Sequence, residues 1–296
     1  MTKNPTMKIL SDFNLTVDAD EVNKHLEKIK EGLLPSGDKE LLKKIFGLID
    51  LTTLSERDNI ENVSQMCEKV NLLGDSYPSM PGVAAICVYP EMVSVVKEKL
   101  ENPLVSIASV GGGFPASQTF TNIKVMEIEQ AIEHGAEEID IVLPVGKFLM
   151  DDLEYVEYEI QVIKQRMGSV HLKVILETGS LKDYSLIRKA SFLTIGAGAD
   201  FIKTSTGKIS PGATPEAMIV MCGAIRDYYN RTGKKIGIKP AGGISDAPTA
   251  VLYYTIVKEI LGEDWLNCER FRIGASGLAN HLLAHIFDKG PDFGYF

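Results

Sequence analysis

The stretch Ala199-Asp-Phe-Ile-Lys-Thr-Ser-Thr-Gly-Lys208 places a lysine inside a short apolar run that ends in a glycine turn. The same arrangement recurs in Ile236-Gly-Ile-Lys-Pro-Ala-Gly-Gly243. A lysine on a buried strand must be paired with a carboxylate or lose its proton, because burial disfavours the ammonium. Lys203 and Lys239 therefore indicate two strands that carry reactive groups into the interior of the fold.

Comparable apolar runs recur along the whole chain. They lie at 47–54, 83–89, 104–110, 138–143, 172–178, 201–206, 235–241 and 270–275. The segments between them have the apolar spacing of helices and lie at 58–73, 90–101, 121–134, 152–167, 181–195, 214–230 and 247–261. In the first of these, Ile60, Val63, Met66, Cys67 and Val70 share one face. Eight apolar strands with helices between them favour an α/β fold, a (β/α)₈ TIM barrel, over an open doubly wound sheet.

The beginning of the chain differs from this alternation. Asp18 and Asp20 can cap a helix that carries Val22, Leu26, Ile29 and Leu33 on one stripe, and Gly32 and Pro35 can end it. We therefore expect residues 1–40 to form an N-terminal helical extension packed on the main body. Residues 41–296 are expected to form the barrel as a single domain.

Composition narrows the class of protein. The chain has 296 residues, 45% hydrophobic content and a formal net charge of −9, with an isoelectric point near 5.2. An acidic surface disfavours non-specific binding to nucleic acid, so no nucleic-acid partner is expected. The first residues contain too short an apolar patch for a signal peptide or a membrane span. We expect a cytoplasmic protein that does not contact a membrane.

Neither a metal nor another cofactor is expected. Cys67, Cys87, Cys222 and Cys268 are far apart and form no Cys-x-x-Cys pair, so they are expected to be reduced thiols. His281 and His285 have the i, i+4 spacing of metal ligands, but no third candidate lies near them. Packing or surface roles account better for these two histidines.

The two lysines could activate each other. Neighbouring parallel strands lie about 4.8 Å apart, which would place the two amines roughly 6 Å apart. At an effective dielectric constant of about 20, the repulsion between two charges at that distance is roughly 3 kcal/mol. It would lower the pKa of one lysine, and a neutral lysine is a nucleophile for carbonyl carbon. The alternative is that each lysine only pairs with a carboxylate at the barrel mouth.

Side-chain alternation selects further candidates for the barrel interior. One choice of face points Lys203, Lys239 and Asp140 into the same mouth, where TIM-barrel active sites lie. The same argument offers Asp50, Cys87 and Lys173, with Glu177, on other strands.

Glycine-rich turns follow the last three strands, at Thr206-Gly207-Lys208, Gly242-Gly243 and Gly274-Ala275-Ser276-Gly277. Exposed backbone N–H groups and a lysine can bind an anion, and late barrel loops often hold phosphate. A phosphorylated small molecule is therefore the expected substrate. The alternative is that these glycines only permit tight turns.

Several motifs in series resemble the deoxyribose-phosphate aldolase family. They are Asp50-Leu-Thr-Thr-Leu54, Ala85-Ile-Cys-Val-Tyr-Pro90, Glu138-Ile-Asp-Ile-Val-Leu-Pro144, Glu177-Thr-Gly179, the Lys203 run, Lys239-Pro-Ala-Gly-Gly243 and Ile273-Gly-Ala-Ser276. They occur in order between about residue 45 and residue 277. The resemblance implies reversible cleavage of 2-deoxy-D-ribose 5-phosphate to acetaldehyde and D-glyceraldehyde 3-phosphate by a class I, metal-free mechanism.

By motif position, the resemblance implies a Schiff base on Lys203, with Lys239 lowering its pKa and Asp140 acting as general acid/base. It places Asp50 and Cys87 in the pocket lining. Substrate-binding positions are expected at Asp50, Thr52, Cys87, Lys173, Thr206, Gly207, Lys208, Gly242, Gly243, Gly274 and Ser276. A homodimer is the expected assembly.

Two positions depart from the family pattern. Ser245 stands in the loop where the family commonly has an arginine, and Gly277 stands where a second serine is common. Both differences predict weaker discrimination between phosphorylated and non-phosphorylated aldehydes. A role in the active site is left open for Tyr295, which precedes the final Phe296. Two alternatives remain: another Schiff-base sugar-phosphate aldolase or transaldolase, and a non-catalytic barrel that binds phosphorylated metabolites.

Overall fold

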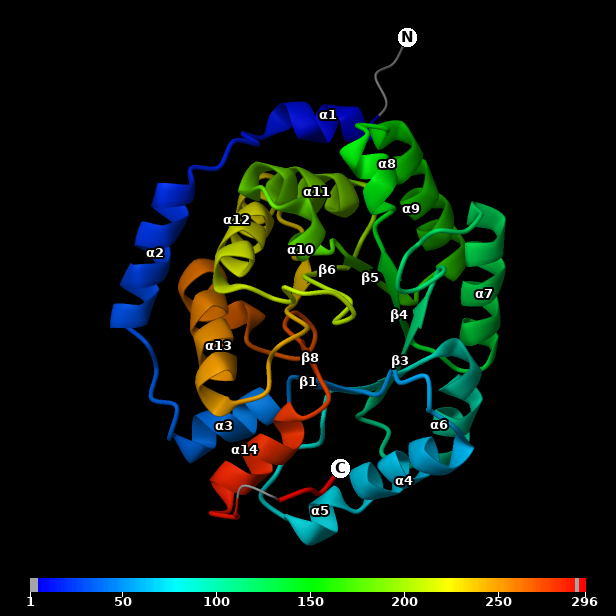
Figure 1. Cartoon of the computed structure of the whole chain (residues 1–296), viewed down its shortest axis with the longest axis vertical. Coiled ribbons are helices and arrows are strands. Elements are labelled where there is room, and N and C mark those ends of the chain that lie inside the picture. Colours follow the sequence, from blue (N-terminus) through cyan, green and yellow to red (C-terminus); the bar gives the residue numbers. More distant parts are fainter. Residues whose placement is uncertain (1–4, 291–292) are drawn as a thin grey trace.

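A computed structural model describes residues 5–290 and 293–296. Within them, eight parallel strands form a ring surrounded by helices (Figure 1). The strands are β1 (Ile49–Thr52), β2 (Ala85–Val88), β3 (Ser106–Gly111), β4 (Glu138–Val142), β5 (His171–Ile175), β6 (Phe201–Lys203), β7 (Gly237–Lys239) and β8 (Ile273–Ala275). Each strand overlaps one of the predicted runs; β3 extends one residue past its run, to Gly111, and β5 begins one residue before its run, at His171.

The sheet closes on itself. Its strand order is β7-β6-β5-β4-β3-β2-β1-β8, and two isolated parallel bridges, Ile238 with Phe271 and Ala241 with Gly274, join β7 to the β8 segment. Closure removes the exposed edges that an open sheet would leave. The predicted (β/α)₈ TIM barrel is confirmed.

The helices follow the predicted alternation. They are α1 (Pro5–Asp12), α2 (Ala19–Glu31), α3 (Lys39–Phe46), α4 (Ile60–Asn71), α5 (Leu73–Ser76), α6 (Val93–Lys99), α7 (Thr121–Glu133), α8 (Val145–Leu149), α9 (Leu153–Met167), α10 (Thr178–Leu181), α11 (Tyr184–Gly196), α12 (Pro215–Thr232), α13 (Ala247–Leu261) and α14 (Leu278–Ile286), with short 3₁₀ helices at Pro90–Met92 and Glu263–Trp265. Ile60 was predicted to share the apolar face of this helix with Val63, but it is the first residue of α4 and is 65% exposed, so it does not belong to the buried face. The first buried position, Val63, comes one turn later.

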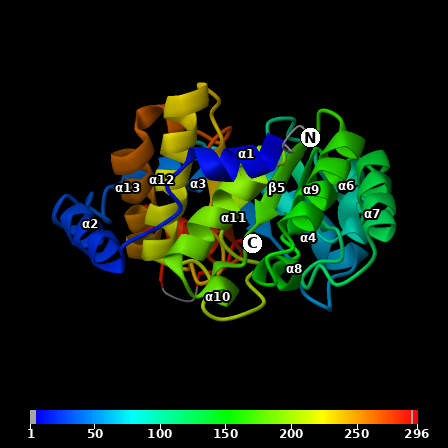
Figure 2. The same ribbon diagram turned by 90° about the horizontal axis from the view of Figure 1, so that it is seen from above.

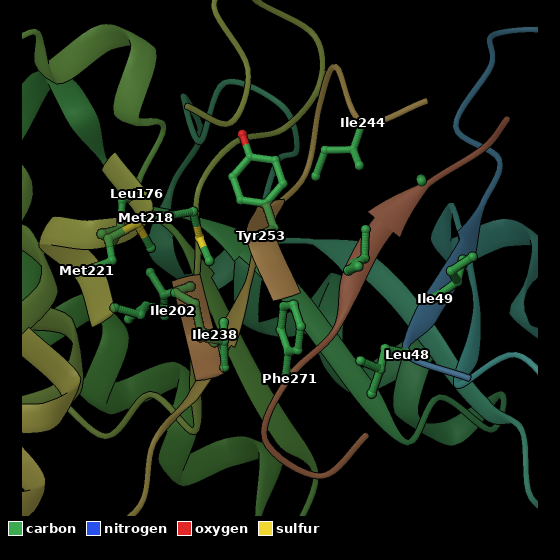
Figure 3. Close-up of a cluster of buried hydrophobic side chains, with 14 of the residues drawn as sticks. Leu48, Ile49, Leu176, Ile202, Met218, Met221, Ile238, Ile244, Tyr253 and Phe271 are labelled. Atoms are coloured by element: carbon green, nitrogen blue, oxygen red, sulfur yellow. The ribbon is translucent and has the colours of Figure 1, made fainter. Parts of the chain in front are cut away.

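The main core lies between the outer face of the strands and the helices. Ile202 of β6, Ile238 of β7 and Met218 of α12 belong to this cluster, part of which is drawn in Figure 3. The apolar side chains of each strand face this layer on alternate positions. The other strand positions are therefore left to fill the barrel interior.

The N-terminal segment covers the outside of the barrel. The Asp18 side chain caps α2 by accepting a hydrogen bond from the Asp20 backbone N–H, and Gly32 ends the helix. As predicted, α2 buries Val22, Leu26 and Ile29, and it contacts α12 and α13. Leu33 was predicted on the same stripe, but it follows the end of the helix and is 39% exposed. Helix α1 was not predicted; it packs against α11 (Figure 2).

Candidate active site

Lys203 and Lys239 lie side by side at the ends of β6 and β7. Their Cα atoms are register partners across the two strands. Lys203 Nζ donates a hydrogen bond of 2.7 Å to Asp140 Oδ2, and Lys239 Nζ donates one of 2.8 Å to the same oxygen. Asp140 comes from β4, which is not adjacent to either strand, so the three side chains meet across the barrel interior.

A second group of charges lies against this triad. Asp50 Oδ2 is 2.5 Å from Lys239 Nζ, and Asp50 Oδ1 accepts a hydrogen bond of 2.7 Å from Arg272. Arg272 also donates 2.8 Å to Glu138 Oε1. Lys173 pairs closely with Glu138, and its Nζ lies 3.6 Å from Asp140 Oδ1. All these side chains are buried.

Arg272 and Glu138 belong to this network although neither was predicted as a site residue from the sequence. Each interrupts an apolar run, as Lys203 and Lys239 do, and Glu138 shares a strand face with Asp140. The same argument from burial and alternation could therefore have identified both residues.

The surroundings separate the pKa values of the two lysines. Burial lowers the pKa of Lys203 below that of an ordinary lysine; the Asp140 carboxylate opposes this effect and the Lys239 ammonium adds to it. Burial would also lower the pKa of Lys239, but the carboxylates of Asp140 and Asp50 outweigh it and raise that pKa. Lys239 is therefore protonated in the resting protein, beside an amine that loses its proton more easily.

The carboxylate between the lysines stays ionised. Burial alone would raise the pKa of Asp140, but the charges of Lys203, Lys239 and Lys173 hold it well below its usual range. No donor among residues 5–290 and 293–296 hydrogen-bonds Asp140 Oδ1. This oxygen faces Lys173, whose Nζ lies 3.6 Å away, and Asp140 itself is buried and does not line the cavity described below.

Two glycines make room for these long side chains. A Cβ atom at Gly237 would lie 2.3 Å from the ring of Phe201, and one at Gly274 would lie 3.1 Å from Lys239 Cε. The Phe201 ring in turn lies 5.7 Å from Lys173 Nζ. Glycine at both positions is therefore required by packing inside the barrel, in addition to any role in turns.

A cavity of about 620 Å³ opens above Lys203 at the carboxyl ends of the strands. It is lined by Thr52, Thr53, Leu54, Ser55, Glu56, Lys203, Thr206, Gly207, Lys208, Ala241, Gly242, Gly243, Ile244, Ser245, Gly274, Ala275, Ser276 and Gly277. All the residues predicted from the late glycine turns lie in this wall, as does Thr52. Asp50, Cys87 and Lys173, also predicted to bind substrate, are buried beneath the cavity and do not line it.

The loops after β6 and β7 hold the cavity wall together. The Ala213 backbone N–H donates 3.0 Å to the Gly242 carbonyl, and a Cβ atom at Gly212 would lie 2.5 Å from that carbonyl oxygen. Lys208 Nζ reaches across the mouth and donates to the Leu54 carbonyl. These contacts place one lysine, several hydroxyl groups and the Glu56 carboxylate around the outer part of the cavity.

The C-terminal tail lies beside the cavity. Tyr295 donates from its hydroxyl to the Lys69 carbonyl at 2.9 Å, and Asn280 Oδ1 accepts hydrogen bonds from the backbone N–H groups of Tyr295 and Phe296. Phe296 lines a smaller cavity of about 310 Å³ that shares Thr52 with the main one. The Tyr295 side chain is not part of the main cavity wall.

The described residues contain no helix long and apolar enough to cross a membrane. Within the same residues, no group of three or more His, Cys, Asp or Glu side chains is arranged to hold a metal ion. The acidic side chains beneath the cavity are instead paired with lysine and arginine.

Residues 45–257 match the DeoC/LacD family of aldolases. The chain belongs to this family. It is 42% identical to the deoxyribose-phosphate aldolase of Homo sapiens over 256 residues, which cover 83% of this chain and 80% of the human protein. The family consists of enzymes, which favours an enzyme over the alternative of a non-catalytic barrel.

Solved structures agree with this membership. A crystal structure from Toxoplasma gondii superposes with a TM-score of 0.76 at 21% identity, covering 86% of this chain and 96% of that chain, and supports the fold alone. A tetrameric deoxyribose phosphate aldolase from Aeropyrum pernix superposes with a TM-score of 0.64 at 25% identity, covering 90% of this chain and 98% of that chain.

Proposed function

We propose that this DeoC/LacD aldolase reversibly cleaves 2-deoxy-D-ribose 5-phosphate to acetaldehyde and D-glyceraldehyde 3-phosphate through a Schiff base on Lys203. The observation that carries the proposal is the position of Lys203. It lines the cavity, it shares one oxygen of Asp140 with Lys239, and its pKa is lowered by burial. The substrate assignment is supported by the human relative.

In this mechanism the neutral Lys203 amine attacks the aldehyde carbon of the open-chain sugar, and loss of water produces an iminium. A base removes the proton of the 3-hydroxyl group, the C2–C3 bond breaks, and its electron pair forms an enamine on the two-carbon fragment. Glyceraldehyde 3-phosphate leaves. Protonation of the enamine carbon and hydrolysis of the iminium then release acetaldehyde and regenerate Lys203.

Asp140 and Lys239 are the proposed proton carriers. Asp140 Oδ1, which accepts no hydrogen bond from the described residues, is proposed to accept and return a proton through a water molecule, and the Lys239 ammonium 2.8 Å from Oδ2 keeps the carboxylate ionised between steps. At pH 7, an ordinary lysine with a pKa of about 10.4 is only roughly 0.04% neutral. Lowering the pKa of Lys203 is therefore the main contribution of its surroundings.

The proposed phosphate site is the outer cavity wall. Thr206, Gly207 and Lys208 on one loop face Gly242 and Gly243 on the next, and Gly274 and Ser276 complete the wall. Backbone N–H groups in such glycine turns bind anions. Asp50, Cys87 and Lys173 are proposed to act from beneath, by shaping and charging the floor, while Thr52 contacts substrate directly.

This site is also proposed to discriminate weakly against non-phosphorylated aldehydes. Ser245 and Gly277, which replace an arginine and a serine common in the family, both line the cavity, and so does Glu56, whose carboxylate lies 3.8 Å from Arg57 Nε. A carboxylate near a phosphate costs binding energy, and the missing guanidinium removes a bidentate donor.

Trapping with borohydride tests the proposed function. With acetaldehyde present, reduction should leave a two-carbon adduct on Lys203, found by mass spectrometry of the digested protein. Lys203→Leu should lose both the adduct and the cleavage of deoxyribose 5-phosphate while keeping its near-UV circular dichroism, whereas Lys234→Leu, at an exposed position, should lose neither. An adduct on Lys203 without cleavage of this sugar would indicate another Schiff-base aldolase or a transaldolase. Absence of any lysine adduct would refute the proposal.

The assembly and the division of the chain are also proposals. A homodimer is supported by the large apolar side chains left exposed at α7, which are Phe120, Ile123 and Met126. Light scattering on the purified chain would test it, with a monomer as the contradicting result.

Residues 1–40 are proposed as an extension that supports the catalytic unit 41–296. The protein is also proposed to act in the cytoplasm, which its four unbridged cysteines support.

A further inference from the structure

Arg272 is a buried charge that the proposed reaction does not use directly. It stands immediately before β8 and is 3% exposed. One of its terminal nitrogens lies 2.7 Å from Asp50 Oδ1 and the other 2.8 Å from Glu138 Oε1, while its Nε donates to the Cys268 carbonyl. Burying a guanidinium costs desolvation energy, which the two carboxylate partners of Arg272 offset. A buried charge held in this way is a candidate for a functional role.

A continuous chain of ionic contacts joins Arg272 to Lys203. Arg272 contacts Asp50, Asp50 lies 2.5 Å from Lys239 Nζ, and Lys239 donates to the oxygen of Asp140 that also accepts from Lys203. Asp50 therefore holds Lys239 from one side while Asp140 holds it from the other. Because Arg272 holds Asp50, the position of Lys239 depends on Arg272.

The interior also contains an excess of cationic groups. The cations are Lys173, Lys203, Lys239 and Arg272, and the carboxylates are Asp50, Glu138 and Asp140. Other titratable groups that face this network are Cys87 on β2, Cys268 beside Arg272, and His171, whose Nδ1 lies 4.0 Å from Glu138 Oε1. Burial raises the pKa of the Cys87 thiol, which keeps it neutral.

The charges balance when one lysine is neutral. A closed, low-dielectric interior disfavours an uncompensated charge. Lys203 is the lysine that borders the cavity, whereas Lys173 and Lys239 are enclosed by carboxylates. Lys203 is therefore the group that can release its proton to water and restore neutrality.

We propose that Arg272 is a positioning residue of the aldolase: through Asp50 it holds Lys239 in place, and its permanent charge supplies the excess that keeps Lys203 neutral. This inference rests on the proposed Schiff-base function. It predicts that the network responds to its total charge, so that substitutions at residues that do not line the cavity change the protonation of Lys203.

Variants that change the charge in opposite directions provide the test. The readout is the rate of borohydride trapping of acetaldehyde on Lys203 as a function of pH. Arg272→Met leaves three cations and three carboxylates, so trapping near pH 7 should fall by about tenfold or more and recover as the pH rises. Asp50→Asn, in which the two side chains have similar shapes, should move the pH range in which the trapping rate rises to lower pH. The double variant restores an excess of one cation, so its trapping profile should return toward that of the unmodified protein.

Arg272→Lys is the matched control, because it keeps the charge and should keep the pH profile. A merely structural role would reduce trapping equally at every pH, and that result would overturn the proposal, as would an Asp50→Asn profile that does not move. If Arg272→Met fails to fold, as judged by circular dichroism, Asp50→Asn alone tests the proposal. A pH profile of trapping that moves to lower pH supports it, and one that moves to higher pH contradicts it. If the unmodified protein forms no adduct on Lys203, the proposed function itself is refuted. If it forms the adduct but the pH profile of trapping moves in none of the variants, only the role of Arg272 is refuted.

Discussion

Replacing Lys239 by leucine would remove the positive charge nearest to Lys203. The two amines lie 2.7 and 2.8 Å from the same oxygen of Asp140, and with an angle of about 110° at that oxygen they are about 4.5 Å apart. At an effective dielectric constant of about 20, two unit charges at this distance repel each other by about 4 kcal/mol. Both groups are buried, so salt screens this repulsion little.

The sign of the effect on Lys203 follows from this repulsion. Lys239 contributes to lowering the pKa of Lys203, so its removal raises that pKa and leaves more of the amine protonated at neutral pH. Losing about 4 kcal/mol of repulsion between the two ammonium groups lowers the neutral fraction of Lys203 by about two to three powers of ten. Lys239→Leu should therefore trap acetaldehyde two to three powers of ten more slowly at about pH 7 and approach the unmodified rate at higher pH.

The assay measures imine trapping and sugar cleavage in parallel between about pH 6 and pH 10. Trapping reports the nucleophile alone, whereas cleavage also reports proton transfer by Lys239 and Asp140. Lys239→Arg is the control, since it keeps a charge at this position and should keep the trapping profile. A trapping profile that falls equally at every pH in Lys239→Leu would refute the electrostatic argument.

Three further predictions concern specificity, packing and the tail. Ser245→Arg adds a guanidinium to the cavity wall and should raise the ratio of kcat/KM for phosphorylated over non-phosphorylated aldehydes by about tenfold. Ser245→Gln is the uncharged control, and an equal ratio in the two variants would place the phosphate elsewhere. Gly237→Ala puts a Cβ atom 2.3 Å from the Phe201 ring and should lower the free energy of unfolding by about 1–3 kcal/mol in denaturant titrations; an unchanged midpoint would contradict the packing. Asn280→Ala removes the acceptor of two tail N–H groups and should speed carboxypeptidase removal of Phe296. An unchanged rate would contradict this role of Asn280 and assign the anchoring of the tail to its aromatic contacts.

Much of the fold was predictable because its signals are local. Each strand needed only a short apolar run followed by a turn, and the alternation of side chains put Lys203, Lys239 and Asp140 on interior faces. The structure brings these three together at one oxygen. Errors arose at helix ends, at Ile60 and Leu33, because burial there depends on where a helix stops relative to the strands beneath it.

The division of the candidate residues between cavity wall and interior could not be predicted from the sequence. Thr52 and Ser276 line the cavity, whereas Asp50 and Lys173 lie below it. Alternation tells which face a residue occupies, but its depth depends on the register of strands that are distant in the sequence. Asp50 meets Lys239 only because β1 and β7 lie on either side of β8 in the closed sheet.

The order of motifs along the chain was sufficient to indicate the fold, the family resemblance and the lysine most suited to attack a carbonyl. The closed barrel added the network that joins Arg272, Asp50 and Glu138 to that lysine. A residue type and its strand face are properties of a short segment, which is why they can be read from the sequence. The pKa of Lys203 depends on burial and on charges contributed by several strands, and only the folded barrel brings those charges within a few ångströms of each other.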